Sequence, residues 1–485
     1  MPAQLTTRAQ VNGYRFLLRR YEHALVRRDV RMLHDPMRSQ TRSLVVGAVL
    51  GLLVVAGAAI LAFLRPQGSI DDAKIVMAKE TGALYAVVDG IVHPVLNLAS
   101  ARLITQSNES PTSIKSSKLS GLPRGALLGI PGAPAQLPGS STGKNSSWTL
   151  CDTVSLSASG SATASPGSKT TVIAGSLEST AESVARPMAA GEALLVIKGD
   201  KTFLLFDGKR AEIDPKDAVM AQSMTLRNHQ ARPISTGLLN SATQVSPLTP
   251  PPIARLGEPG PGRLSSVPVG GVVRVRGVAT DDLYVVLADG VQRVSPFAAD
   301  VVRNANSQGM SDITTVPPDR LVGVPVVNQL ALDHFPRSTP KILAAEDAPV
   351  GCIAWSKGAE DPDATVTILA GRKLPLAASA IPVGLATSDG TGDRIDAAYL
   401  RPGSGEYVQV TGMDPQSPRR GSLFYVGDTG IRYGVPDAGT AAILGLEEKP
   451  RLAPWAIIGQ LVPGPTLSPS EALVAHDVLP TGTTR

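Results

Sequence analysis

The chain has 485 residues, too many for one ordinary domain, and 43% of them are hydrophobic, which is enough to form folded cores. Its 47 glycines and 40 prolines favour β-rich modules with many turns over long helical bundles. The net charge of +5 arises at the N-terminus, because residues 1–43 hold nine arginines and three acidic residues while the remainder is near neutral. The large remainder lacks the basic surplus of a nucleic-acid-binding domain, so we expect no nucleic-acid partner.

The first 43 residues contain a stretch compatible with a basic amphipathic helix, RAQVNGYRFLLRRYEHALVRRDVRM. Its apolar side chains fall at helical spacing, with arginines between them. The apolar members are Tyr14, Leu17, Leu18, Tyr21 and Leu25. Two interpretations remain open. The helix rests on anionic lipid headgroups, or it docks onto cytoplasmic partner proteins, and we favour docking.

Residues 44–64, LVVGAVLGLLVVAGAAILAFL, contain no charged or strongly polar side chain. A helix of this length spans ~30 Å, the thickness of the hydrocarbon core of a bilayer. The alternative is a signal peptide cleaved near Ala58, but the preceding 43 residues are too many for its basic leader. The arginines before the segment predict a cytoplasmic N-terminus, a single-pass membrane anchor and a bulk that is extracytoplasmic.

After the membrane segment, one pattern occurs four times: an apolar run, a turn with Asp and Gly, and a second apolar run. The turns contain Asp89 and Gly90, Asp207 and Gly208, Asp289 and Gly290, and Asp428 and Gly430. An Asp-Gly pair between alternating apolar runs is a strong hairpin signal. Two helical stretches follow each hairpin, and Asp214-Pro215 and Ser295-Pro296 look like helix starts. Each repeat is therefore predicted to be β-β-α-α in about 50 residues, too small to be stable without neighbours.

The sequence between these repeats is duplicated as well. TTVIAGS at 170–176 matches TVTILAG at 365–371, and the only two cysteines, Cys151 and Cys352, each have a tryptophan three residues away. In an oxidising compartment the two cysteines are expected to form one disulfide, the alternative being two unrelated buried thiols. The expected fold class is α+β: one N-terminal transmembrane helix and an elongated extracytoplasmic domain, with a central β-rich domain and four β-β-α-α repeats in pseudo-two-fold arrangement.

The expected domain boundaries follow from these patterns. They are 1–43 for the cytoplasmic helix, 44–64 for the transmembrane helix, 75–128 for repeat 1, 129–192 for the first part of the central domain, 193–246 for repeat 2, 247–271 for a Pro-rich linker, 272–326 for repeat 3, 327–420 for the second part of the central domain, and 421–478 for repeat 4 with the C-terminal segment.

Residues with catalytic or ligand-binding signatures are scarce. The stretch GSSTGKN, from Gly139 to Asn145, differs from a phosphate-binding loop by one residue in spacing and has Asn where a hydroxyl is needed for Mg²⁺. The triplet Asp428-Thr429-Gly430 matches an aspartic-protease motif but has no second copy with which to share a proton. The six histidines are scattered. We therefore predict no catalytic, cofactor-binding or metal-binding residues.

Several longer stretches resemble a known family. They are TTRAQVNGYRFLLRRYEHALVRRDVRM, GALYAVVDGIVHPVLNLASARLI, WTLCDTVS, YVVLADGVQRVSP and APWAIIGQLVPGPTLSPSEALVAHDVLP. Together they resemble EccB, a membrane component of the mycobacterial type VII (ESX) secretion system, over nearly the whole chain. The resemblance implies a central domain with four repeats, and Cys151 and Cys352 look like the family disulfide.

The resemblance also implies a place in the cell inner membrane, with the bulk of the chain periplasmic. It implies the partners EccC, EccD, EccE and the mycosin protease, with self-association in a hexameric complex. Members of the family are often described as ATPases, which makes ATP the alternative cofactor. The repeats of the family are said to look like a cell-wall-binding subunit of a phage lysin, which makes wall binding another alternative. Because the residues contain no Walker motif, we expect a structural core subunit that scaffolds the assembly at the periplasmic face.

Overall fold

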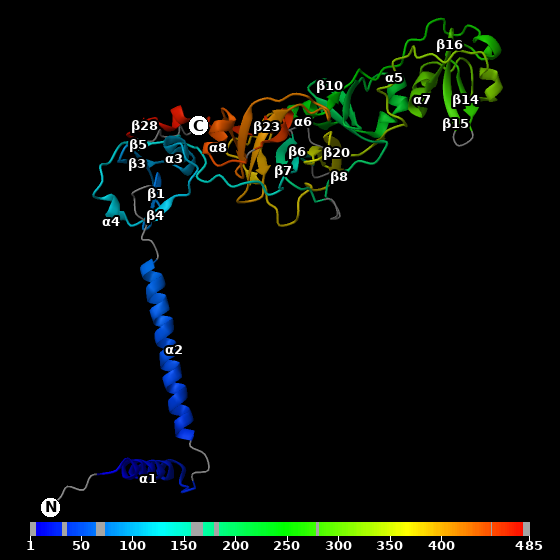
Figure 1. Ribbon diagram of the computed structural model, residues 1–485. Helices are drawn as coiled ribbons and strands as arrows, with labels where there is room; N and C mark the ends of the chain where they lie inside the picture. The colour runs from blue at the N-terminus through cyan, green and yellow to red at the C-terminus, as the bar shows by residue number, and fades with distance from the viewer. Residues whose placement is uncertain are drawn as a thin grey trace, which may run out of the picture. The chain divides into compact units, whose positions relative to one another are not determined.

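The computed structural model describes residues 6–31, 36–64, 73–156, 168–178, 184–277, 281–447 and 449–478 (Figure 1). The chain separates into two compact units, Met1–Asp72 and Ala73–Arg485. Each unit has its own organisation, the first helical and the second rich in β-structure.

The first unit consists of two helices. Helix α1 (Arg8–Arg27) begins where the Thr7 N–H donates to Gln10 Oε1 at 3.0 Å, and it ends at Arg28, which has a left-handed backbone. Helix α2 (Pro36–Leu64) contains the apolar window Gln40–Leu61, with a mean hydropathy of 2.8. This window is long and apolar enough to cross a membrane, and it overlaps the predicted transmembrane segment of residues 44–64. The helix starts before the apolar run, at Pro36, a residue that is common at the first position of helices.

The second unit contains four sheets with a common strand order. In each, three antiparallel strands are followed by a helix, a short strand parallel to the first, a second short helix, and a last pairing parallel to the third. In repeat 1 the elements are β1 (Ile75–Ala78), β2 (Leu84–Val88), β3 (Ile91–Val95), α3 (Leu98–Thr105), β4 (Thr112–Ile114), α4 (Ser116–Leu119) and β5 (Leu127–Leu128). In repeat 2 they are β9 (Glu192–Lys198), β10 (Lys201–Phe206), β11 (Lys209–Ile213), α5 (Ala218–Ser223), η1 (Leu226–Asn228), β12 (Arg232–Pro233), α6 (Thr236–Ser241) and β13 (Thr243–Gln244).

Repeats 3 and 4 follow the same order. Repeat 3 contains β14 (Val272–Arg276), β15 (Asp281–Leu287), β16 (Gly290–Val294), α7 (Pro296–Ala305), β17 (Thr314–Val316) and η3 (Pro318–Leu321), and a single parallel bridge from Val291 to Val326 stands in place of its last strand. Repeat 4 contains β23 (Gly405–Thr411), β24 (Leu423–Gly427), β25 (Ile431–Val435), α8 (Ala438–Ile443), β26 (Arg451–Pro454), α9 (Trp455–Ile458) and β27 (Val462–Pro463).

The β-β-α-α order expected for each repeat is incomplete. The first strand and the two short parallel strands of each repeat were missed. No Asp-Gly turn joins a first strand to the second, and the parallel strands have only two to four residues and pair with segments farther away, so neither carries a hairpin signal. Repeat 4 starts with β23 at Gly405 and not at residue 421, since residues 412–422 form a long connection where the other repeats have a short one. Helix α5 is capped by Asp217 and not by Asp214, whereas Ser295 caps α7 as predicted.

The hairpin turns lie where the Asp-Gly pattern occurs. Asp89 and Asp207 have left-handed backbones, and the glycine after each also has positive φ, as a two-residue turn of this type requires. In the third hairpin the turn is one residue earlier, and Gly290 is the first residue of β16. A side chain there would place its Cβ 2.3 Å from the Pro325 carbonyl oxygen, so glycine is required by close packing.

A seven-stranded sheet in the second unit is formed by strands from both halves of the duplication, in the order β21-β22-β7-β6-β19-β20-β8. Its strands are β6 (Ser146–Val154), β7 (Ser168–Ala174), β8 (Arg186–Pro187), β19 (Val350–Lys357), β20 (Thr365–Gly371), β21 (Val383–Gly384) and β22 (Ala397–Tyr399). The two middle strands, β6 and β19, are antiparallel and come from different halves. The outer strands are exchanged between the halves. Strand β8 from the first half pairs with β20, and β22 from the second half, which has β21 at its outer side, pairs with β7.

The cysteines and tryptophans occupy opposite faces of this sheet. Cys151 lies opposite Cys352 and Trp148 lies opposite Trp355 across the β6–β19 pair. Because side chains alternate between faces along a strand, residues three apart point in opposite directions. The cysteines accordingly belong to one core cluster and the tryptophans to another. The tryptophans therefore do not pack in the same cluster as the cysteines, although each lies only three residues from a cysteine in the sequence.

Shared cores join neighbouring parts of the second unit. One cluster combines Leu103 of repeat 1 with Tyr425 of repeat 4, and another combines Leu204 of repeat 2 with Phe297 of repeat 3. A third combines Trp148 of the central sheet with side chains of repeats 2 and 4. The remaining elements are η2 (Gly262–Leu264), β18 (Lys341–Ile342), α10 (Pro469–Ala472) and β28 (Ala475–His476). Strand β28 pairs with β5, so the C-terminal segment completes the sheet of repeat 1.

Candidate functional site

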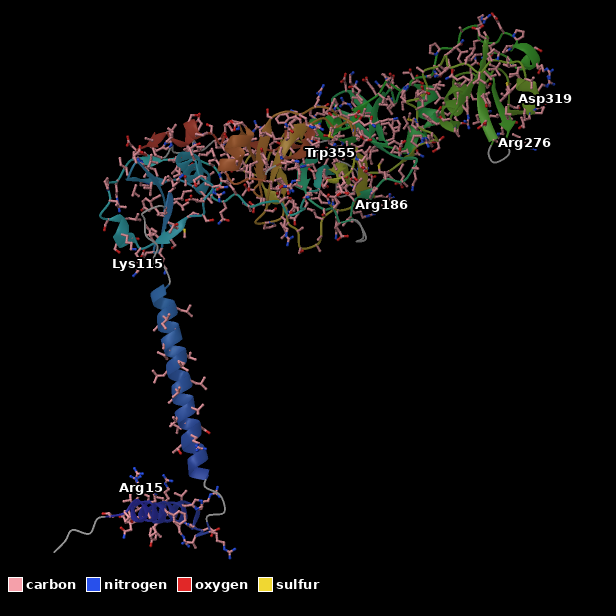
Figure 2. The ribbon with its side chains drawn as sticks, in the orientation of Figure 1. Arg15, Lys115, Arg186, Arg276, Asp319 and Trp355 are labelled. Atoms are coloured by element: carbon pink, nitrogen blue, oxygen red, sulfur yellow. A yellow bond between two sulfur atoms is a disulfide. The ribbon has the colours of Figure 1, made fainter. Side chains whose placement is uncertain are left out.

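The apolar residues predicted for docking all lie exposed on α1. The exposed fractions are 65% for Tyr14, 48% for Leu17, 45% for Leu18, 67% for Tyr21 and 81% for Leu25. The intervening arginines, such as Arg15, project from the same helix (Figure 2). The helix therefore presents apolar and cationic groups together, which suits a protein surface or a lipid surface.

A disulfide joins Cys151 to Cys352 at the centre of the duplicated domain. Both cysteines are fully buried, at 0% and 1% exposure, on the middle strands β6 and β19. Trp355 marks the position of this sheet in the ribbon (Figure 2). The bond closes a separation of 201 residues and ties the first half of the domain to the second.

Two arginines attach repeats 2 and 4 to the central sheet in equivalent ways, and we call them the arginine clamps. Arg232 and Arg451 each lie three residues before the N-cap of the second helix of their repeat. Arg232 donates to the carbonyl oxygens of Leu343 and Ala348, in the segment that leads into β19. Arg451 donates to the Gly143 carbonyl oxygen, in the loop that leads into β6. Each half therefore holds the central strand of the other half.

The two clamps differ in their surroundings. Burial lowers the pKa of Arg232 to about 10, which still leaves it protonated at neutral pH. Arg451 has carboxylate partners, Glu447 at 2.9 Å and Glu406 at 3.3 Å. Burial raises the pKa of Glu406, opposed by a hydrogen bond from the Ser140 hydroxyl and by the charge of Arg451.

Buried carboxylates bind the strands of the central sheet to their surroundings. Asp152, on β6, accepts hydrogen bonds from the Thr170 hydroxyl at 3.0 Å and the Ser235 N–H at 2.6 Å. Its burial raises its pKa to about 6. Asp396 accepts from the Thr170 N–H at 2.7 Å and the Ser388 hydroxyl at 2.6 Å. These contacts connect β6, β7 and α6.

A salt bridge at the edge of the sheet connects it to repeat 2. Glu192 of β9 receives two hydrogen bonds from Arg186 of the edge strand β8, at 2.9 and 3.1 Å. The Arg186 guanidinium is the main reason that the pKa of Glu192 falls to about 2. Figure 2 marks Arg186.

The structure gives the two suspected catalytic motifs other roles. Asp428 lies in the turn between β24 and β25 and accepts a hydrogen bond from the Gly403 N–H at 2.8 Å. The loop of residues 139–145 leads into strand β6, whereas a phosphate-binding loop leads into a helix. Among the residues with described positions, no group of three or more His, Cys, Asp or Glu side chains could hold a metal ion.

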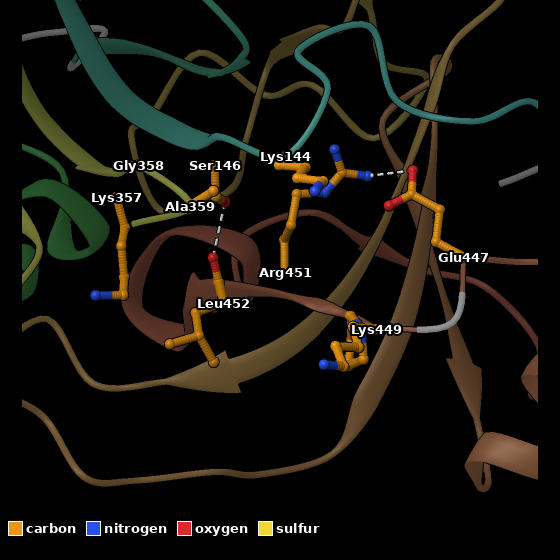
Figure 3. Close-up of a pocket in the computed structure, with 10 residues that line it drawn as sticks. Lys144, Ser146, Lys357, Gly358, Ala359, Glu447, Lys449, Arg451 and Leu452 are labelled. Atoms are coloured by element: carbon orange, nitrogen blue, oxygen red, sulfur yellow. Dashed lines mark hydrogen bonds and ion pairs between the residues drawn. The ribbon is translucent and has the colours of Figure 1, made fainter. Parts of the chain in front are cut away.

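A cavity of about 510 Å³ lies beside this loop, where the central sheet meets repeat 4 (Figure 3). Lys144, Lys357, Lys449 and Arg451 contribute to its lining together with Glu447. Lys144 belongs to the stretch GSSTGKN, but this convergence of charges, the arginine clamps and the role of Asp152 were not predicted from the sequence. A charged residue inside the apolar strand WTLCDTV was the available signal for Asp152.

The fold and these contacts define a membrane-anchored protein with a duplicated, disulfide-bonded domain of four similar sheets around a central one. The family described as "Type VII secretion system ESX-1, transport TM domain B" matches residues 3–481, and the chain belongs to this EccB family. The resemblance inferred from the sequence is confirmed.

Relatives and solved structures agree with this assignment. The chain is 38% identical to "ESX-1 secretion system ATPase EccB1" of Mycobacterium tuberculosis over 482 residues, 99% of this chain and 97% of the relative. It is 38% identical to "ESX-3 secretion system ATPase EccB3" of Mycolicibacterium smegmatis, covering 98% and 92%. A chain of the "intact ESX-5 inner membrane complex" matches with a TM-score of 0.74 and 33% identity, covering 100% and 98%. A chain of the "EccB3 dimer from the ESX-3 core complex" matches with a TM-score of 0.70 and 36% identity, covering 83% and 100%.

Proposed function

We propose that this chain is a structural core subunit of an inner-membrane type VII secretion complex. The observation that carries the proposal is the match of the whole chain, at 33% identity, to a subunit of a solved ESX inner-membrane complex. The membrane helix α2 anchors the subunit, and the duplicated domain contributes to the periplasmic face of the assembly.

The contacts within the duplicated domain suit a scaffold. The disulfide, the arginine clamps and the shared cores connect each half to the other at several points. A domain held in this way transmits force between attached partners without opening at its centre. The four sheets also offer surfaces on which further subunits, or copies of the same chain, can assemble.

The orientation and the partners are further parts of the proposal. The arginines before α2 support a cytoplasmic N-terminus and a periplasmic domain. The proposed partners are EccC, EccD, EccE and the mycosin protease, in a hexameric complex, as expected for the family. Reporter fusions after residue 120 test the orientation: phosphatase activity supports it, and cytoplasmic fluorescence contradicts it.

We propose that α1 is the cytoplasmic docking element. Tyr14, Leu17 and Tyr21 lie on one side of the helix, whereas Phe16 lies on the other. Because most helical stability in proteins comes from packing of an amphipathic face, docking would stabilise α1. Lipid headgroups are the alternative surface.

The test combines native electrophoresis of solubilised membranes with mass spectrometry of the co-migrating chains. Tyr14, Leu17 and Tyr21 are changed together to Ala, and Phe16→Ala on the opposite side of α1 is the control. The triple variant is expected to be absent from the large complex and to stop secretion, while the control is incorporated. Incorporation of the triple variant with normal secretion would leave the lipid surface as the role of α1.

Nucleotide hydrolysis is a second candidate function, because the EccB1 and EccB3 relatives are named as ATPases. The loop geometry at residues 139–145 does not support it, since the loop continues into a strand. We expect no ATP turnover by the purified chain. Turnover that Lys144→Ala removes and that Lys216→Ala leaves intact would establish hydrolysis.

A further inference from the structure

The cavity beside the 139–145 loop brings together positive charges from three separate segments. Lys144 precedes β6, Lys357 ends β19, and Lys449 and Arg451 lie at the start of β26 (Figure 3). The single acidic residue among those that line the cavity, Glu447, already forms an ion pair with Arg451.

The amines of the cavity differ in how far they are engaged. Lys357 donates to the carbonyl oxygens of Asp361 and Pro362 at 2.6 and 2.8 Å. Within the described part of the chain, Lys144 and Lys449 have neither a hydrogen-bond partner nor an ion-pair partner for their amines. Arg451 is 7% exposed, and its Nε likewise lacks a partner among the described residues. Two amines are therefore available to a ligand, and a third cation is buried at the cavity wall.

The duplication shows that this charge is not a requirement of the fold. Counted from the paired cysteines, the positions equivalent to Lys144 and Lys357 are Ala345 and Leu156. Counted from the helix N-caps, the position equivalent to Lys449 is Gln230. Only the clamp itself, Arg232 for Arg451, is retained in the other half. The three lysines are thus an addition to one half of a duplicated framework.

We propose that this cavity binds a phosphate-bearing anion. Lysine amines are compact, strongly hydrated charges that suit phosphate groups, which accept hydrogen bonds from several directions. A volume of about 510 Å³ lies within the usual range for small-molecule sites. Because the cavity lies at the junction of the central sheet with repeat 4, a bound anion would bridge these two parts of the domain.

The test is calorimetric titration of the full-length chain in detergent micelles with inorganic pyrophosphate, ATP and citrate. Pyrophosphate and ATP are expected to bind, and citrate is expected to bind more weakly, if the site selects phosphate. Lys144 and Lys449 are changed together to Ala, which is expected to weaken pyrophosphate binding about tenfold, at roughly two- to five-fold per exposed amine. Lys201→Ala with Lys216→Ala removes the same charge elsewhere and should leave binding unchanged.

Three results would overturn the proposal. They are absence of pyrophosphate binding, equal weakening in the control pair, and citrate binding as tight as that of pyrophosphate. The first result overturns the proposal even if ATP binds, because the nucleoside would then be the recognised group. Tryptophan fluorescence checks that both double variants are folded. Since no secretion assay enters, the outcome is independent of the proposed scaffold function.

Discussion

The disulfide between Cys151 and Cys352 makes a testable contribution to the stability of the central sheet. Changing both cysteines to Ala removes a cross-link between residues separated by 201 positions. In the chain-entropy account, closing a loop of this length stabilises the folded state by about 5 kcal/mol. The two strands still pair over eight residue positions in the variant, so we expect a folded but less stable domain.

The expected shift of the unfolding midpoint follows from the size of the unit. The unfolding entropy is about 2.1 cal/mol/K per residue, so about 5 kcal/mol lowers the midpoint by about 6 °C when the whole unit of about 410 residues unfolds together. Smaller cooperative units would give a larger shift. The midpoint is therefore expected to fall by at least about 6 °C.

The tryptophans provide a specific assay. Trp148 and Trp355 are each 1% exposed on the strands that carry the cysteines, whereas Trp455 is 46% exposed. In a Trp455→Phe background, fluorescence during heating reports on the central sheet. Single variants, such as Cys151→Ser, should behave like the double variant, since one cysteine cannot form the bond.

A reductant supplies the control. Both cysteines are buried, so reductant that is added to the folded wild type and removed before heating should leave the unfolding midpoint unchanged. Reductant that is present during heating should lower the midpoint. An unchanged midpoint in the double variant would refute the reasoning, and so would free thiols in the normally exported protein.

Two further predictions concern buried charges near this sheet. Burial raises the pKa of Asp152 from 3.8 to about 6, so the folded state binds the proton of this carboxyl group more tightly than the unfolded state does. The tighter proton binding stabilises the folded state below about pH 4, and this stabilisation is lost as the pH rises to about 6. Relative to wild type, Asp152→Asn should therefore gain about 2.4 kcal/mol in the free energy of unfolding between pH 4 and pH 7. No change in that difference would contradict the prediction. Arg232→Met should lower the free energy of unfolding by about 2–5 kcal/mol, because it leaves the carbonyl groups of Leu343 and Ala348 unpaired, and Arg232→Lys should lower it less. Denaturant unfolding measures both variants. Equal stability of Arg232→Met and wild type would exclude the clamp role.

Features governed by neighbouring residues were predictable from the sequence. The membrane helix is visible in the uninterrupted apolar run, because lipid requires about 20 apolar residues in a row. The hairpins are visible at Asp89 and Asp207, because a two-residue turn needs positive φ and selects Asp-Gly. The helix α7 is visible at Ser295, since its cap and its first residue are adjacent in sequence.

Features that depend on partners distant in the sequence were decided by the tertiary structure. Strands β12 and β26 contain two and four residues and pair with strands formed much earlier in the chain, so no local pattern indicates them. The exchange of β8 and β22 between the halves is likewise set by which edges remain free when β6 pairs with β19.

The charges show the same division. The sequence by itself determined an anchored chain with a duplicated β-rich domain, because periodicity and turn chemistry act between residues close in the chain. Only the tertiary structure placed Arg232 against Ala348, and Lys144 beside Lys357 and Lys449, because a charge meets its partners or shares a cavity only when strands from both halves have paired.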